Sequence, residues 1–249
     1  PGGPELSKAR ARILELGGIQ AANSYVKINL SLFGLYPSEH RPSIPPEMML
    51  LPGKFIYQMS SWSRAIVVPL SIVHAFNPQR PVPAGFDLQE LFLPGAKMTY
   101  LGARHALSWR NFFLVADRVF KKWEKHAPKW PRTLAIRRAE RWMLERTRYS
   151  DGLGAIYPPM MYIMMALDML GYSRKHPAFV EAHDQFMRLL TDDGRRFFFQ
   201  PCFSPVWDTA IAGFALAQSG YASAGMLGRM ADWLLSKEVR RKGDWSVKR

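Results

Sequence analysis

The amino-acid sequence predicts an all-α protein organised as an array of helix pairs. Helical periodicity of the apolar residues runs through most of the 249 residues, whereas alternating strand-like runs bounded by Asn-Gly or Asp-Gly turns are nearly absent. In the second half, amphipathic and apolar helices also alternate at a regular spacing. Because one helix of each kind per repeat is what a closed or open array of helix pairs requires, these observations favour that architecture.

Glycines and prolines divide the first half of the chain into helices. Gly17 and Gly18 separate two periodic segments, and three prolines crowd into residues 77–93. That stretch is a surface connection and the best candidate for an internal domain boundary. The helices expected in this half cover residues 5–16, 19–33 and 60–76.

The second half predicts a repeat. Three amphipathic helices carry Trp142, Phe186 and Trp233 at matching places, 44 and 47 residues apart. Pro159 and Pro205, 46 residues apart, precede the more apolar helices between them. The amphipathic helices are expected over 131–148, 177–190 and 222–238, and the apolar ones over 160–170 and 206–218. Amphipathic helices would form an outer wall and apolar helices an inner wall, although an irregular bundle with coincidental spacing stays open.

Excess positive charge indicates an anionic partner surface. The formal net charge is +14, and residues 101–150 hold 13 Lys or Arg against 4 Asp or Glu. The single cysteine, Cys202, excludes an internal disulfide. No apolar run approaches the roughly 20 residues that a membrane-spanning helix needs. The sequence starts at Pro1 without a signal-peptide pattern, so we expect a piece of a longer protein.

Residues 108–130 combine aromatic and basic side chains at helical spacing. As one helix, this segment has a basic side and an apolar side. This pattern is typical of an interfacial anchor that places aromatic rings in the headgroup layer of a membrane. The membrane-interface candidates are Phe112, Phe113, Phe120 and Trp123. The same composition also suits nucleic-acid binding or a solvated structural helix.

Five motifs occur in an order that resembles one enzyme family. The longest motif reads QPCFSPVWDT and covers residues 200–209. The others are PPEMMLLP, SSWSRAIVVPL, DGLGAIYPPM and ADWLLSKEVRRKGDW, which begin at residues 45, 60, 151 and 231. Over essentially the whole chain they resemble the squalene-hopene cyclases, a family of triterpene cyclases. The resemblance implies α/α-barrel domains of the terpenoid cyclase type, with residues 1–249 forming a portion of one domain of a two-domain enzyme.

The resemblance also implies a reaction, the proton-initiated cyclisation of squalene, a linear C30 polyene, to a pentacyclic triterpene. Aromatic rings suit the carbocations of such a reaction, because the ring quadrupole attracts a cation without offering a lone pair that would quench it. The positions that match a substrate cavity are Trp62, Ile156, Tyr157 and Trp207, and those that match a substrate channel are Met59 and Val67. Many relatives have Gln where this chain has Tyr157.

The acid motif of the family is missing from this sequence. In the family, the catalytic acid lies in an Asp-Val-Asp-Asp-Thr motif, whereas the one adjacent acidic pair here, Asp192-Asp193, precedes Gly194 in an apparent turn. We therefore expect no catalytic residue in this chain and no activity from the chain alone. No metal or other cofactor is expected.

The resemblance predicts partners and a location. The expected partners are squalene or a related polyprenoid, the membrane surface, a second cyclase domain and a second copy in a homodimer, but no nucleic acid. The expected location is monotopic, on the cytoplasmic side of a bacterial membrane.

Two other functions stay open on the residues alone. The first is a noncatalytic helical scaffold that binds a membrane or nucleic acid through residues 108–130. The second is an α/α-barrel glycosidase, which needs two carboxylates facing one cleft, and Asp151 and Asp208 are its candidate pair. Asp208 could equally stabilise the start of a helix.

Overall fold

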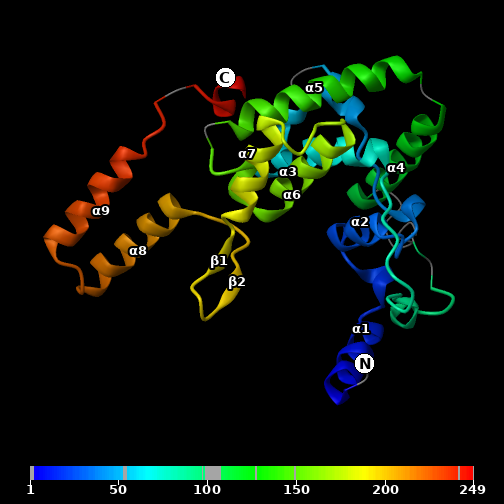
Figure 1. Cartoon of the computed structure of the whole chain (residues 1–249), viewed down its shortest axis with the longest axis horizontal. Coiled ribbons are helices and arrows are strands. Elements are labelled where there is room, and N and C mark those ends of the chain that lie inside the picture. Colours follow the sequence, from blue (N-terminus) through cyan, green and yellow to red (C-terminus); the bar gives the residue numbers. More distant parts are fainter. Residues whose placement is uncertain are drawn as a thin grey trace. The chain divides into compact units, whose positions relative to one another are not determined.

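The computed structural model describes residues 3–52, 55–96, 98, 108–126, 128–148, 150–240 and 242–248. Helices dominate this part of the chain (Figure 1), which confirms the all-α fold class. The helices are α1 (Pro4–Glu15), α2 (Ser24–Leu32), α3 (Ser61–Phe76), α4 (Trp109–His126), α5 (Lys129–Thr147), α6 (Tyr157–Met169), α7 (Pro177–Met187), α8 (Pro205–Ser219) and α9 (Ala224–Ser236). Two short strands, β1 (Leu190–Asp192) and β2 (Phe197–Phe199), pair antiparallel.

The chain folds into two compact units, residues 1–45 with 73–132 and residues 46–72 with 133–249. In the first unit, the guanidinium of Arg41 is buried and donates to Ser31 Oγ at 2.9 Å and to Asn77 Oδ1 at 2.6 Å. These hydrogen bonds join the segment after α2 to the residue that follows α3. They satisfy donors whose burial without partners would be costly.

His74 near the end of α3 gives the first unit a pH-dependent stability. Burial lowers the pKa of its imidazole to about 4, and the charges of Arg41, Lys121 and Arg132 act in the same direction, against a hydrogen bond to the Pro42 carbonyl. Because the pKa in the folded state lies below the unfolded value of about 6.5, the stabilisation is complete above pH 6.5 and is lost as the pH falls towards 4.

We therefore expect acidification from pH 7.5 to 4 to remove about 3 kcal/mol of stability through His74 alone. Urea denaturation at several pH values measures this loss. In the His74→Gln variant the loss should be smaller by that amount, and identical pH profiles for the two proteins would contradict the assignment.

The core of the second unit forms around α6. Its side chains Met160, Tyr162, Ile163 and Leu167 are almost completely buried. Helix α7 packs against α6 and buries Phe179, Ala182 and Gln185, and α5 contributes Ala135, Ala139 and Met143. A uniformly apolar helix such as α6 is stable in water only when neighbours cover it on several sides. The side chains of this apolar helix are buried, as its composition predicts, and its place on an inner wall stays a prediction.

Several predicted element bounds were wrong. No single helix covers 19–33, because Asn23 is extended and its side chain accepts the Val26 amide at 3.0 Å, which starts α2 at Ser24. The segment 108–130 is likewise two helices, α4 ending at His126 and α5 beginning at Lys129. The hairpin β1–β2 was not predicted, because three consecutive phenylalanines show no alternation.

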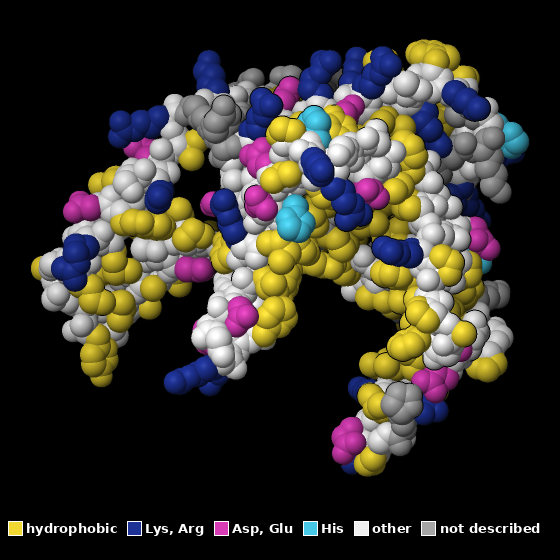
Figure 2. Space-filling model, in the orientation of Figure 1, with side chains coloured by type: hydrophobic (Ala, Val, Ile, Leu, Met, Phe, Trp, Pro, Cys, Tyr) yellow, Lys and Arg dark blue, Asp and Glu magenta, His cyan; other side chains and the backbone are white. Residues whose placement is uncertain are grey.

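Helices α8 and α9 pack against each other, yet neither contains a buried residue. Hydrophobic side chains are therefore visible over this pair in Figure 2, and the most exposed on α8 are Trp207 and Phe214. The apolar helix over 206–218 thus contains no buried residue in the described part of the chain, and its place on an inner wall stays a prediction.

Candidate functional site

The turn before α6 holds two of the predicted cavity residues. Gly152 and Gly154 have φ angles of 103° and 71°, and Ala155 has 52°, so three nearby residues occupy the left-handed half of φ space. Glycine adopts such angles at little cost, whereas an alanine there is strained. The turn ends in extended Ile156, and Tyr157 then begins α6. The side chains of Ile156 and Tyr157 are both partly exposed.

Backbone hydrogen bonds join this turn to the QPCFSPVWDT motif. The amide of Tyr157 donates to the Pro201 carbonyl at 2.8 Å, and the amide of Phe203 donates to the Ala155 carbonyl at 3.1 Å. Ile156 pairs with Cys202 in an antiparallel bridge between these bonds. Two of the sequence motifs, separated by more than 40 residues in the chain, therefore lie side by side.

Tyr157 belongs to a cluster of three aromatic rings, and we call this cluster the aromatic trio. The ring centroid of Tyr157 lies 5.7 Å from that of Phe186 on α7 and 5.3 Å from that of Phe199 on β2. The rings of Tyr157 and Phe199 are perpendicular. Phe186 and Phe199 are themselves 5.7 Å apart. Edge-to-face packing fixes such rings and leaves some faces available to a cation. The Tyr157 hydroxyl lies 3.0 Å from Met161 Sδ, a weak acceptor.

Helix α3 approaches the same turn through small residues. A Cβ built on Gly154 would lie 3.1 Å from Cβ of Ala65, so only a small residue fits at either place. Trp62 lies one turn before Ala65 and is exposed, while Met59 and Val67 are partly exposed. No ring contact joins Trp62 to the aromatic trio within the described ranges.

Trp207 stands in the first turn of α8 and is exposed. Its neighbour Asp208 accepts a hydrogen bond from the Ser204 hydroxyl at 2.9 Å, at the amino-terminal end of the helix. A carboxylate at this end interacts favourably with the helix dipole, which supports the helix-start role of Asp208. As with Trp62, the part of the chain that the structure describes shows no ring contact between Trp207 and the aromatic trio.

The four aromatic residues expected at a membrane interface are all exposed on α4. Phe112 and Phe113 pack edge to face with a centroid distance of 5.4 Å, and the ring of Trp109 contacts both of them. On the basic side, Lys122 is exposed, whereas Lys121 pairs with Asp117 at 2.5 Å. The side chains of Arg110 and Lys125 lie outside the described residues. Helix α4 thus has the two-sided surface that the periodicity predicts.

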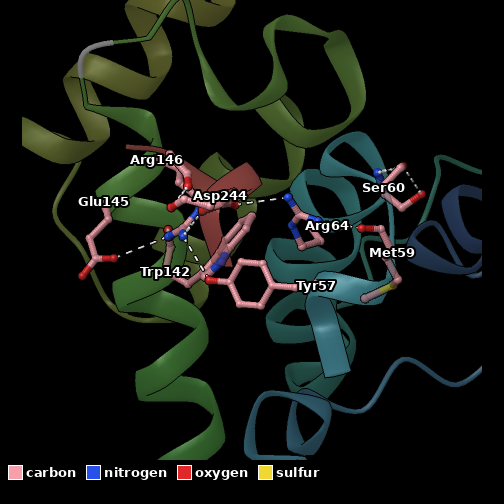
Figure 3. Close-up of polar contacts among 11 residues, drawn as sticks. Tyr57, Met59, Ser60, Arg64, Trp142, Glu145, Arg146 and Asp244 are labelled. Atoms are coloured by element: carbon pink, nitrogen blue, oxygen red, sulfur yellow. Dashed lines mark hydrogen bonds and ion pairs between the residues drawn. The ribbon is translucent and has the colours of Figure 1, made fainter. Parts of the chain in front are cut away.

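Figure 3 shows a polar cluster that the sequence did not predict, which we call the Asp244 clamp. The carboxylate of Asp244 accepts from Arg146 Nη2 at 2.5 Å and Nε at 3.0 Å, and from Arg64 Nη2 at 3.3 Å. Arg146 Nη2 also donates to the Tyr57 hydroxyl at 3.2 Å. The cluster joins the segment after α9 to α3 and α5. Asp244 is separated in the sequence from Arg146 by 98 positions and from Arg64 by 180 positions, so no local sequence pattern predicts this cluster.

The charges of the clamp stabilise each other. Burial acts to raise the pKa of the Asp244 carboxyl, but the hydrogen bonds and charges of Arg146 and Arg64 outweigh it and lower the pKa below its ordinary value. Burial likewise acts to lower the pKa of Arg146, and Asp244 reverses that effect, so this pKa is raised. Both groups are therefore ionised over the physiological pH range.

Comparison with known proteins assigns the chain to a family. A model of the squalene-hopene cyclase N-terminal domain matches residues 1–195, and a model of the squalene-hopene cyclase C-terminal domain matches residues 203–249. The chain belongs to the squalene-hopene cyclase family. Its fold is therefore of the terpenoid cyclase α/α-barrel type.

Relatives in the squalene-hopene cyclase family match the whole chain. It is 36% identical to a squalene–hopene cyclase of Zymomonas mobilis, covering 100% of this chain and 39% of that protein. It is 35% identical to a squalene–hopene cyclase of Bradyrhizobium diazoefficiens, covering 99% of this chain and 38% of that protein. It is 34% identical to a dammaradiene synthase of Dryopteris crassirhizoma, and the match covers 97% of this chain and 36% of that protein. The chain thus spans about two fifths of the length of these relatives.

A backbone hydrogen bond connects the two squalene-hopene cyclase matches, which are separated in the sequence by residues 196–202. Phe203 begins the C-terminal match and donates to Ala155, which lies within the N-terminal match. Helices α8 and α9 belong to the C-terminal match. None of the helices within the described ranges is both long and apolar enough to cross a membrane, and no group of three or more potential metal ligands occurs among those residues.

Proposed function

We propose that this chain is part of an isomerase of the squalene-hopene cyclase type, which cyclises squalene to a pentacyclic triterpene through proton-initiated carbocation chemistry. The observation that carries the proposal is the pairing of two family motifs beside the aromatic trio. Relatives named as squalene–hopene cyclases match along the whole chain and support the same reaction.

The proposed roles follow the chemistry of a carbocation in an apolar cavity. Tyr157, Trp62 and Trp207 present aromatic faces that stabilise positive charge, and Ile156 forms part of the cavity wall. Met59 and Val67 border the substrate channel. Because Trp62 and Trp207 are exposed in this chain, their roles require that further protein covers them.

The catalytic acid comes from outside the chain in this proposal. A second cyclase domain, or the continuation of this one, supplies the carboxylic acid that protonates the terminal alkene. Residues 1–249 then form a portion of one α/α-barrel domain. The repeat of helix pairs in the second half and an internal boundary over residues 77–93 are further parts of this proposal. A homodimer is compatible with this arrangement, and the chain alone should be inactive.

The proposal places the protein on a membrane, because squalene is insoluble in water. Helix α4 would lie in the headgroup layer with Phe112, Phe113, Phe120 and Trp123 towards the acyl chains. The cytoplasmic face of a bacterial membrane carries anionic lipids that suit the net charge of +14.

The test of the function is a complementation assay. The chain is incubated with squalene alone and together with the remaining part of the Zymomonas mobilis relative, and products are identified by gas chromatography. A cyclised product should appear only in the mixture, and Trp207→Ala should reduce its amount at least tenfold. Product from the chain alone would contradict the absence of the acid. If a mixture whose two chains demonstrably associate yields no product, the noncatalytic scaffold replaces the proposal.

A further inference from the structure

The outer face of α5 carries a row of arginines without partners. Arg137, Arg141 and Arg148 are exposed, and no hydrogen bond or ion pair engages their side chains within the described ranges. They line one hollow of about 690 Å³, which we call the cationic hollow. In Figure 2, Lys and Arg side chains gather along the upper edge, where Figure 1 places α5.

The two acids of the same face are already engaged elsewhere. Glu140 accepts a hydrogen bond from the Tyr172 hydroxyl at 2.5 Å, which raises the pKa of that tyrosine to about 12. Glu145 pairs with Arg146 at 3.4 Å. Arg137 and Arg141 are four residues apart, and like charges at this spacing mildly destabilise a helix. Three guanidinium groups against these two carboxylates leave the cationic hollow with a net positive charge, and the side chains of Arg137, Arg141 and Arg148 remain available to a ligand.

A second hollow adjoins the first and is mainly apolar. This apolar hollow of about 270 Å³ shares Arg141 and Glu145 with the cationic hollow. Its apolar lining consists of Met48, Met49, Leu51, Phe55, Ile56 and Trp142. Leu51 and Phe55 are about half exposed, so the hollow opens to solvent. The buried indole N–H of Trp142 has no hydrogen-bond partner among the described residues.

We propose that the two hollows together bind a phosphate-headed amphiphile. Its phosphoryl group lies among Arg137, Arg141 and Arg148, because guanidinium groups bind phosphate oxygens in a bidentate manner. Its apolar chain enters the adjoining hollow past the shared Arg141 and covers Leu51 and Phe55. Such a site is separate from the aromatic trio and does not depend on cyclase activity.

The first probe is decyl phosphate below its critical micelle concentration, with binding to the full chain measured by isothermal titration calorimetry. The double variant Arg137→Gln/Arg141→Gln should weaken its binding at least tenfold. The matched control Arg188→Gln/Arg229→Gln removes the same charge from exposed positions elsewhere and should change the affinity less than twofold. Circular dichroism confirms that the variants keep their helices.

The second arm tests the apolar hollow. Phe55→Ser should weaken the binding of decyl phosphate at least threefold and leave the binding of inorganic phosphate unchanged. If inorganic phosphate binds as tightly as decyl phosphate, if both double variants lose binding equally, or if decyl phosphate does not bind, the proposal is overturned.

The source of the phosphoryl group is resolved with vesicles. Sedimentation with vesicles of phosphatidylcholine containing phosphatidylglycerol is compared for the wild type and the α5 double variant. Binding that falls at least tenfold in the variant identifies membrane phospholipid as an occupant. Vesicle binding that is unchanged, while decyl phosphate binding is lost, identifies a monomeric phosphate-headed amphiphile instead.

Discussion

Replacing Gly152 with Ala is expected to destabilise the second unit by roughly 2 to 4 kcal/mol, from backbone strain and overpacking together. The φ angle of 103° lies where an L-residue with a side chain is strained. The added Cβ would also clash with Cε of Met160 and stand 2.9 Å from its Sδ. Met160 is flexible but 1% exposed, so its side chain has little room to move away.

The matched control for this substitution is Gly171→Ala. Gly171 has a comparable φ of 83°, but no atom lies within 4 Å of a Cβ built there. Its cost should be confined to backbone strain of about 1 to 2 kcal/mol. Urea denaturation followed by circular dichroism measures both variants. Equal costs for the two would show that the contact with Met160 does not constrain the turn.

The same turn matters for function, because Gly152 sets the path of the chain into Ile156 and Tyr157. A shift of this turn would alter the hydrogen bonds to Pro201 and Phe203 and thereby the position of the aromatic trio. In the complementation assay, Gly152→Ala should therefore lower product formation even at temperatures where the protein remains folded.

Features encoded by local periodicity could be predicted from the sequence. Helices α3, α6 and α8 follow continuous apolar patterns and end within about three residues of their predicted bounds. The turn at Asp192 to Gly194 is confirmed, because both aspartates accept backbone amides two residues ahead. The amphipathic character of α4 was equally visible in the sequence, since it depends only on spacing.

Features that depend on distant contacts could not be predicted. Tyr157 was a candidate from the family motif, but its ring partner Phe199 lies on a strand that shows no alternation. Arg146 and Asp244 are charged residues in charged segments, and nothing local distinguishes them from solvated side chains. The exposure of Trp207 was also unforeseen, because an apolar helix is ordinarily buried and burial depends on which other segments cover it.

Replacing Asp244 with Asn is expected to destabilise the second unit by roughly 2 kcal/mol, because it leaves two arginines without a carboxylate. Removing one partner of a buried ion pair costs about 3–5 kcal/mol. Asp244 is 26% exposed, so solvent screening reduces that value, although the Arg64 side chain is only 6% exposed. The control is Asp168→Asn, whose pair with Arg174 is longer and largely exposed and should contribute less than about 0.5 kcal/mol.

The pH dependence of the Asp244 clamp distinguishes charge from shape. The pKa of Asp244 in the folded state lies below its ordinary value, so its stabilisation is complete above the unfolded pKa of about 3.9. The contribution is lost as the pH falls through the lower folded pKa. The difference in unfolding free energy between wild type and Asp244→Asn should be constant from pH 7 to 5 and shrink below pH 4. A difference that persists undiminished at pH 2 would contradict a stabilisation that depends on the charge of Asp244.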